Sequence, residues 1–199
     1  EVTELFEVVD AICRRTGAST VEVARDEAHR MRIWRGRKAA FAAMGRVSPN
    51  YYVQDGVVPR TRLPEVLQRI RDLEARSGLR IGNVFHAGDG NLHPLICYDE
   101  AIPGQAAHAE AVASEILQYC LDAGGALTGE HGVGADKKAH MGKMFREVDL
   151  EAMQRLRCAF DPAGLCNPDK VFPTPRLCGE VPGPYREHPV ERAGLAERF

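Results

Sequence analysis

The sequence has neither a large excess of charge nor a long apolar run, and both absences exclude classes of function. Its 199 residues hold 26 Lys and Arg against 28 Asp and Glu, giving a formal net charge of −2. Basic residues are scattered, apart from a cluster at 30–38 that falls in a predicted helix, so no nucleic-acid binder is indicated. No stretch approaches the roughly 18 consecutive apolar residues of a membrane span, and the first residues lack a signal-peptide pattern. We therefore expect a cytoplasmic protein with no transmembrane segment.

Paired cysteine motifs and nucleotide-binding fingerprints are also missing. Six cysteines stand at positions 13, 97, 120, 158, 166 and 178, with no C-x-x-C spacing, so we expect buried free thiols and not a zinc ribbon or a disulfide scaffold. Gly129 and Gly134 have the first spacing of a P-loop, but Ala135 and Asp136 stand where Lys and Ser or Thr would be needed. No G-x-G-x-x-G follows a predicted strand.

Apolar periodicity predicts helices and strands in alternation. We expect helices over 3–17, 26–44, 63–78, 105–123 and 149–160, and strands over 19–24, 50–59, 79–88 and 91–100. This order indicates an α+β domain in which helices cover an antiparallel sheet.

The stretch "FHAGDGNLHP" contains two histidines, His86 and His93, around a glycine-rich turn. Asp89-Gly90 is a dipeptide preferred in two-residue type I′ hairpin loops, and that loop would place His86 directly opposite His93. Cβ atoms so paired lie about 4.5 to 5.5 Å apart, so both imidazoles could bind one metal ion. Pro94 predicts a sheet edge or an opening toward a cavity. The alternative is a histidine pair that caps a hairpin without any ligand.

A second stretch, "GGALTGEHGVGADKK", places five glycines around Glu130 and His131. So much backbone freedom suggests close approach to a ligand. Two histidines and one carboxylate leave open positions on a divalent metal, as in catalytic sites. The alternative is a solvated acid beside a surface histidine.

The motifs "WRGRKAAF", "YYVQDGVVP", "FHAGDGNLHP", "TGEHGVGADKKAHM" and "FDPAGLCNPDKVF" occur in this order. Together they resemble the C-terminal half of the FAD-linked D-2-hydroxyacid dehydrogenases, in their glycolate oxidase and D-lactate dehydrogenase branches, over roughly residues 1–173. The resemblance implies an α+β cap with a ferredoxin-like sheet. It also implies a substrate, a small 2-hydroxy acid such as glycolate or D-lactate, that is oxidised to the 2-oxo acid. FAD would be held mainly by a separate N-terminal domain that this chain lacks.

The resemblance also assigns roles to the site residues. His86, His93 and Glu130 match ligands of a divalent metal, which Zn, Mn or Fe would suit. His131 matches the base that takes the proton of the substrate hydroxyl while hydride passes to the flavin. A histidine suits that role because its unperturbed pKa lies near 6.5.

Two further residues and a domain division follow from the same resemblance. Arg37 matches the arginine that pairs with the substrate carboxylate, a task for a bidentate guanidinium. Asn167 falls in the segment that returns to the flavin. Val53 and Leu95 stand where longer substrates are bound, and their apolar character favours a small acid. The expected division is a substrate and metal-binding cap over 1–146, a C-terminal helix and flavin-facing segment over 147–173, and a surface tail over 174–199.

Partners and alternatives complete the sequence-based hypotheses. Expected partners are the N-terminal FAD domain and other glycolate oxidase subunits, with flavin and iron–sulfur groups, through which the protein would attach peripherally to the inner membrane. Alternatives are a mononuclear metal hydrolase with the same His, His and Glu set, and a catalytically dead binding fragment. The chain alone is expected to be inactive, since it has no hydride acceptor.

Overall fold

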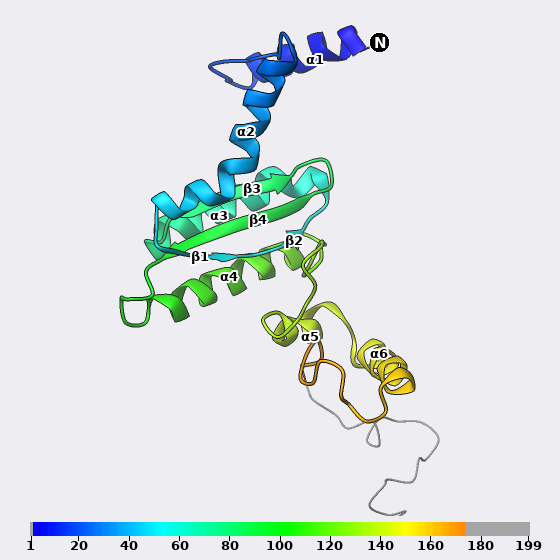
Figure 1. Cartoon of the computed structure of the whole chain (residues 1–199). Helices are drawn as coiled ribbons and strands as arrows, with labels where there is room; N and C mark the ends of the chain where they lie inside the picture. Colours follow the sequence, from blue (N-terminus) through cyan, green and yellow to red (C-terminus); the bar gives the residue numbers. More distant parts are fainter. Residues whose placement is uncertain (1, 174–199) are drawn as a thin grey trace, which may run out of the picture. The chain divides into compact units, whose positions relative to one another are not determined.

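The computed structural model of the protein is described over residues 2–173 (Figure 1). The chain divides into two compact units between Ala43 and Met44. The domain division predicted at 146/147 stays a prediction, and the predicted tail over 174–199 lies outside the described residues. None of the described helices is long and apolar enough to cross a bilayer.

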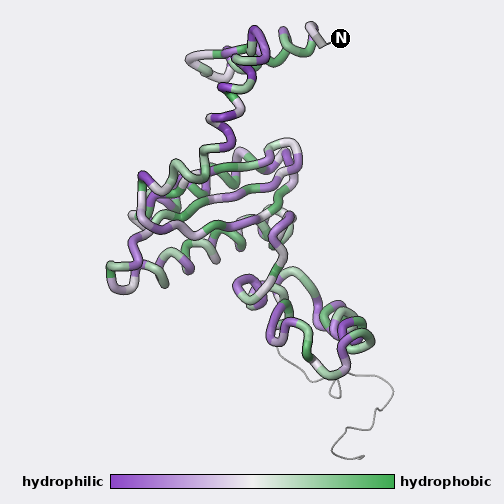
Figure 2. Tube along the Cα trace, in the orientation of Figure 1, coloured by the Kyte–Doolittle hydropathy of each residue, from purple (hydrophilic) through white to green (hydrophobic). Residues whose placement is uncertain are grey.

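The N-terminal unit consists of two helices, α1 (Val2–Arg15) and α2 (Glu27–Ala43). Both were predicted, and the middle of α2 is the hydrophilic, purple stretch of Figure 2. The strand predicted over 19–24 is wrong, because these residues form an irregular connection. A strand needs a neighbouring strand that shares its backbone hydrogen bonds. A contact made from residues 19–24 is through a side chain, since Glu22 Oε1 lies 2.7 Å from Nε2 of the buried His29.

The second unit contains one antiparallel sheet with β4 (Asn91–Tyr98) at its centre. Strand β3 (Ile81–His86) pairs with one side of β4. Strands β1 (Asn50–Val53) and β2 (Gly56–Val57) share the other side, with β1 beside 95–98 and β2 beside 91–92. The single strand predicted over 50–59 is therefore two short strands with a break between them.

Two long helices, α3 (Leu63–Ser77) and α4 (Gln105–Asp122), pack on one face of this sheet. Helix α3 ends where predicted, since Gly78 takes the left-handed conformation with φ 71°. The buried residues that join both helices to the sheet are Val58, Leu63, Val66, Ile70, Leu73, Leu79, Ile81, Leu92, Ile96, Ala109, Val112, Ala113, Ile116 and Cys120. Short 3-10 turns η1 (Met44–Arg46) and η2 (Arg60–Arg62) precede β1 and α3.

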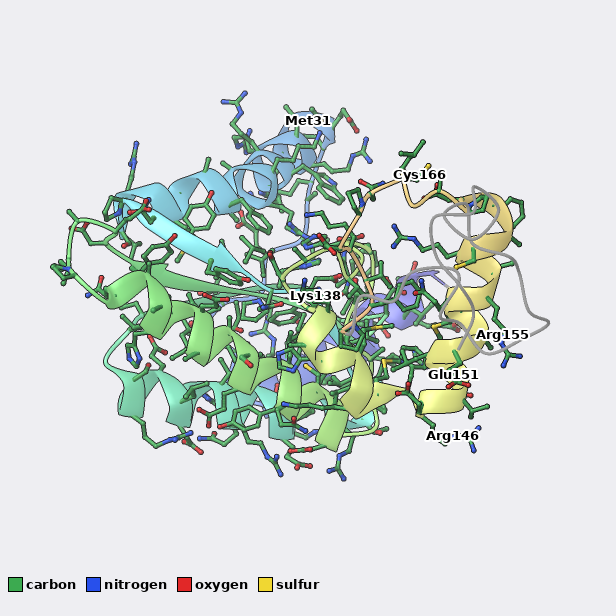
Figure 3. The ribbon with its side chains drawn as sticks, turned by 90° about the horizontal axis from the view of Figure 1, so that it is seen from below. Met31, Lys138, Arg146, Glu151, Arg155 and Cys166 are labelled. Carbon is green, nitrogen blue, oxygen red and sulfur yellow. The ribbon has the colours of Figure 1, made fainter. Side chains whose placement is uncertain are left out.

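A second apolar cluster joins α4 to the following segments. Leu117 of α4 packs with Leu127, Met141 and Leu150. These contacts pack the following segments against α4: η3 (Lys138–His140), α5 (Met141–Met144) and α6 (Glu147–Phe160). Figure 3 labels side chains along α6 and Cys166 in the segment that follows it.

The α+β class predicted from the sequence is confirmed, because helices cover one face of an antiparallel sheet. The cysteine prediction holds only in part. Cys97 and Cys120 are buried free thiols, and burial raises the pKa of Cys120 to about 12. Cys166 is free but exposed, and Cys158 is disulfide-bonded, which corrects the expectation of free thiols.

Candidate metal centre

Strand alternation places His86 and His93 on the sheet face opposite α3 and α4. Leu92 and Ile96 of β4 point into the helix-covered core, so their neighbour His93 points to the other face. In β3, Val84 pairs with His93 and His86 pairs with Asn91, which puts His86 on that same face. The ring centroids of His86 and His93 lie 5.5 Å apart, with the planes at 88°.

The hairpin that carries the histidines differs from the predicted one by two residues. His86 pairs with Asn91, so the loop is 87–90, and the predicted pairing of His86 with His93 is wrong. A type I′ turn needs positive φ at both central residues. Gly90 has φ 72°, but Asp89 is not among the residues with positive φ. Because side chains alternate with period two, a shift of two residues leaves both histidines on the same face.

Pro94 lies in the central strand and not at a sheet edge, contrary to one of its two predicted placements. Its carbonyl accepts the backbone N–H of Gln54, so the position of its missing N–H faces the β1–β2 side. There the neighbouring strand is interrupted between Val53 and Gly56. Because of the break, no backbone N–H is needed at Pro94, and Asp55 lies outside the hydrogen-bonded strands β1 and β2.

The loop after α4 brings Glu130 and His131 to the histidines of the sheet. Glu130 Oε1 lies 3.0 Å from Nε2 of His93, and 3.9 Å from Nε2 of both His86 and His131. The His93 and His131 rings are stacked, with centroids 5.0 Å apart and planes at 17°. The glycine-rich loop permits this, since Gly132 adopts φ 81°. The four residues singled out from the sequence therefore meet at one carboxylate oxygen.

Asp55 is the residue that the sequence analysis missed. Its side chain is 0% exposed, and its Oδ2 accepts a hydrogen bond from Thr128 Oγ1 at 2.6 Å. The same oxygen accepts the backbone N–H groups of Gly129, Glu130 and His131 at 2.9, 3.0 and 2.8 Å. Burial alone would raise the pKa of Asp55, but these hydrogen bonds hold it well below its usual range.

A buried lysine completes the environment of Asp55. Lys137 Nζ donates to the Asp55 carbonyl at 3.1 Å and lies 3.6 Å from its Oδ2. Burial lowers the pKa of Lys137, and the charge of Asp55 opposes that shift. The sequence did carry a signal for Asp55, because a polar pair, Gln54 and Asp55, interrupts an otherwise apolar strand pattern.

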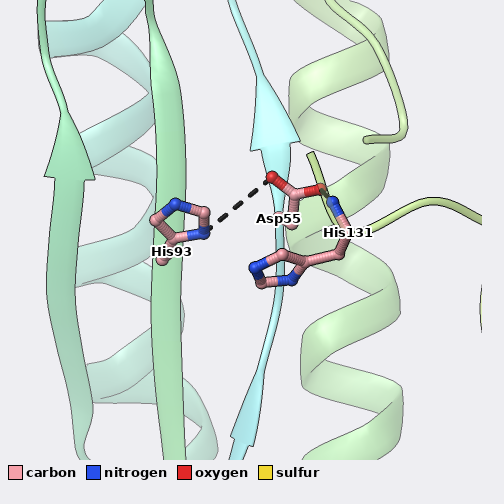
Figure 4. A group of neighbouring side chains, drawn as sticks. All are labelled: Asp55, His93 and His131. Atoms are coloured by element: carbon pink, nitrogen blue, oxygen red, sulfur yellow. Dashed lines mark hydrogen bonds and ion pairs between the residues drawn. The ribbon is translucent and has the colours of Figure 1, made fainter. Parts of the chain in front are cut away.

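Two groups of side chains among the described residues have the spacing to hold a metal ion. One consists of His86, His93 and Glu130, and the other of Asp55, His93 and His131, drawn in Figure 4. Within each group the ligand atoms lie within 4.8 Å of one another. Imidazoles with one carboxylate suit Zn²⁺, Mn²⁺ or Fe²⁺. The side chains of His86, His131 and Glu130 are about half exposed, whereas that of His93 is 3% exposed. A bound ion would thus be open to a small molecule on one side.

The other two predicted site residues lie away from this cluster in the chain. Arg37 is on α2, in the N-terminal unit. Asn167 has φ 46°, and its carbonyl accepts a hydrogen bond from Arg157 Nη2 at 2.9 Å. Its segment returns to the glycine-rich loop 124–138, since Val171 N–H donates to the Gly134 carbonyl at 2.8 Å. Their proposed contacts with substrate and flavin stay predictions.

A small antiparallel sheet, with helices on one face and imidazole and carboxylate groups converging on the other, defines an α+β domain with a candidate metal centre. Comparison with known families agrees with this class. Residues 1–171 match the family described as FAD linked oxidases, C-terminal domain, and the chain belongs to that family.

Curated relatives come from two groups of enzymes. The chain is 45% identical over 94% of its length to Glycolate oxidase subunit GlcD of Escherichia coli (strain K12), and spans 38% of that protein. It is 33% identical over 84% of its length to the Bacillus subtilis protein of the same name, spanning 36% of it. It is 32% identical over 86% of its length to the mitochondrial D-lactate dehydrogenase (cytochrome) of Kluyveromyces lactis, spanning 30% of it. The chain thus spans between 30% and 38% of the length of these relatives.

Proposed function

We propose that this chain forms the substrate- and metal-binding part of a flavin-dependent oxidoreductase that oxidises a small D-2-hydroxy acid, glycolate or D-lactate, to the 2-oxo acid. The observation that carries the proposal is the convergence of His86, His93 and His131 on one carboxylate oxygen of Glu130. Membership of the FAD linked oxidases and the names of the relatives support the redox reaction.

The metal would be held by His86, His93 and Glu130. The donor set fits a divalent ion, because two neutral imidazoles and one carboxylate leave positions for the hydroxyl and carboxylate oxygens of a substrate. When bound, such an ion would lower the pKa of the substrate hydroxyl. His131 is left out of this set, and we infer that its Nε2, which lies 3.9 Å from Glu130 Oε1, receives the hydroxyl proton.

In this reaction the substrate would lose one proton and one hydride. The O–H bond of the substrate breaks and its proton goes to His131. The C–H bond at the α-carbon would break as the C=O bond forms. FAD, which the N-terminal part of the protein would bind, would supply the acceptor for the hydride. Asn167 would face the flavin, and Arg37 would pair with the substrate carboxylate.

The residues beside the cluster favour a short substrate. Val53 pairs with Leu95 in the sheet register, and Leu95 is two residues beyond His93 on the same face. Both side chains are apolar and offer no hydrogen bond to a second polar end of a longer acid. Because two relatives are named glycolate oxidase subunits, we also propose further subunits as partners, with flavin and iron–sulfur groups, and peripheral attachment at the inner membrane.

A chimera tests this proposal. The chain is fused behind the N-terminal part of the E. coli relative, the flavin-loaded protein is mixed anaerobically with glycolate or D-lactate, and loss of the oxidised flavin absorbance is followed. We expect reduction by at least one acid, and reduction about 10²- to 10⁴-fold slower in a His131→Asn chimera. Absence of reduction by both acids, in a chimera that binds flavin and Zn²⁺ or Mn²⁺, would contradict the proposal. The intact E. coli relative is the positive control.

A further inference from the structure

The buried carboxylate of Asp55 lies between the two chain segments that build the metal site. On one side, its Oδ2 binds Thr128 Oγ1 and the backbone N–H groups of Gly129, Glu130 and His131. On the other side, its Oδ1 lies 3.9 Å from Nδ1 of His93, an ion-pair distance that is longer than a hydrogen bond. Asp55 thereby connects the sheet that carries His93 to the loop that carries Glu130 and His131.

The contacts of Asp55 fit a positioning residue better than a metal ligand, although it belongs to one of the two possible ligand groups. A carboxylate oxygen offers about two lone pairs, and Oδ2 already receives four donors. Its Oδ1 faces the ring nitrogen of His93 that points away from Glu130. Metal-binding histidines commonly donate their other ring N–H to such a carboxylate, which fixes the orientation of the ring.

Three consecutive backbone N–H groups that converge on one oxygen force a tight turn. In an extended backbone, adjacent side chains point in opposite directions. In this turn, Glu130 Oε1 and His131 Nε2 lie 3.9 Å apart and share the surroundings of His93. The Lys137 ammonium, 3.6 Å from Oδ2, supplies a counter-charge for the buried carboxylate.

We propose that Asp55 is a positioning residue that assembles the metal site from both sides. It orients the His93 ring so that Nε2 faces the ion, and it folds residues 128–131 so that the Glu130 carboxylate reaches the same point. This inference rests on the proposed metal site but adds a residue that touches neither the ion nor the substrate.

The test uses the full chain with Zn²⁺ and the Asp55→Asn variant. An Asn side chain has one acceptor oxygen, so its NH₂ group faces either the loop N–H groups or His93. We expect Zn²⁺ affinity, measured by titration calorimetry, to fall about 10- to 100-fold. In NMR spectra of the Zn²⁺ form, the His93 Nδ1 proton should exchange faster, and the amides of residues 129–131 should lose protection. Asp89→Asn, in the exposed hairpin loop, makes the same change of charge and should alter none of these.

Comparison with other variants separates the possible failures. Loss of Zn²⁺ binding in Asp55→Asn with an unmoved His93 proton and protected loop amides would overturn the proposal, because Asp55 would then be a ligand. Unchanged affinity in Asp55→Asn would also overturn it. Wild-type affinity in Glu130→Gln would instead contradict the metal site itself.

A milder variant covers the case in which Asp55→Asn does not fold. Thr128→Val keeps the side-chain shape but removes one donor to Oδ2 and the acceptor of the Gly132 N–H, so the amides that report on Asp55 are those of residues 129–131. We expect faster exchange of the loop amides and weaker Zn²⁺ binding, while the His93 Nδ1 proton stays as in the wild type. Loop protection and affinity equal to the wild type would overturn the proposal.

Discussion

Nε2 of His93, in the central strand of the sheet, lies 3.0 Å from Oε1 of Glu130, in the loop that follows α4. An imidazole–carboxylate contact thus joins a strand buried in the fold to an exposed glycine-rich loop. His86 Nε2 lies 3.9 Å from the same oxygen.

The His86→Ala, His93→Ala double variant should lose divalent metal binding. Both imidazoles face Glu130 Oε1, and without them only Glu130 of the proposed ligand set remains, which is a weak site for Zn²⁺ or Mn²⁺ even with His131 beside it. Metal analysis after mild dialysis, with isothermal titration of Zn²⁺ and Mn²⁺, measures this. The control is His108→Ala, which removes an exposed histidine of α4. Equal affinity in the double variant and the wild type would refute the site.

The variants Glu130→Gln and His131→Asn should distinguish the metal ligand from the catalytic base. In the flavin-loaded chimera, Glu130→Gln should lose metal first. His131→Asn should keep the metal and lower kcat by about 10²- to 10⁴-fold, the usual contribution of a positioned base. The measurements are metal content and the rate of flavin reduction. If His131→Asn strips the metal, and excess metal restores the full rate, the two roles are reversed.

The chain by itself should not oxidise any 2-hydroxy acid. Its residues can remove a proton, but no side chain of a protein accepts a hydride from an α-carbon. Incubation with Zn²⁺ or Mn²⁺, glycolate or D-lactate, and an artificial dye should leave the dye oxidised. Dye reduction above that of a His131→Asn control, in protein shown to contain no flavin, would contradict the assigned roles.

Gly90→Ala should destabilise the protein by roughly 2 kcal/mol or more, because it combines backbone strain with a clash. Gly90 has φ 72°, and an added Cβ would lie 2.0 Å from the Val58 carbonyl oxygen. Gly88 is the matched control in the same loop, since an added Cβ there meets no atom within 4 Å. Urea unfolding of the two variants measures the difference. Similar losses in both would show that the hairpin does not pack as described.

His140 should make stability depend on pH. It is buried, with Nε2 2.9 Å from Ser114 Oγ, and burial followed by the charge of Lys143 lowers its pKa from the usual 6.5. Below about pH 6.5 the unfolded chain therefore binds a proton that the folded chain does not, and the free energy of unfolding falls as pH decreases. Urea unfolding between about pH 7 and pH 5 should show a smaller slope for His140→Gln.

The control for that experiment is His108→Gln on α4, which should keep the wild-type slope. Equal slopes for the wild type and His140→Gln would mean that His140 takes up its proton in the folded state as readily as in the unfolded state.

Local patterns in the sequence were enough for most elements of the fold. Helix α3 was predictable because apolar residues repeat at helical spacing and Gly78 ends it. Strands β3 and β4 were predictable from their composition, and so was the shared face of His86 and His93. That last prediction held despite the wrong register, because a shift of two residues does not change the face of a strand.

The strand expected at 19–24 and the unbroken strand over 50–59 were wrong for a common reason. Propensity describes a segment alone, whereas a strand exists only where a neighbour accepts and donates its backbone hydrogen bonds. Residues 19–24 have no such neighbour among the described residues. Residues 50–59 meet Pro94, which cannot donate, and the ladder is interrupted opposite it.

The sequence by itself determined the α+β class, the order of most elements, and the chemical types present at the site: two imidazoles on one strand face, and a carboxylate and an imidazole in a glycine-rich loop. Periodicity and backbone preferences are local, so these features could be read from neighbouring residues. Only the tertiary structure decided that Glu130 meets His93 and that Asp55 folds the loop 128–131. Those contacts join residues far apart in the chain. The break between β1 and β2 turns the buried Asp55 carboxylate toward the backbone N–H groups of residues 129–131, and these N–H groups stabilise its charge.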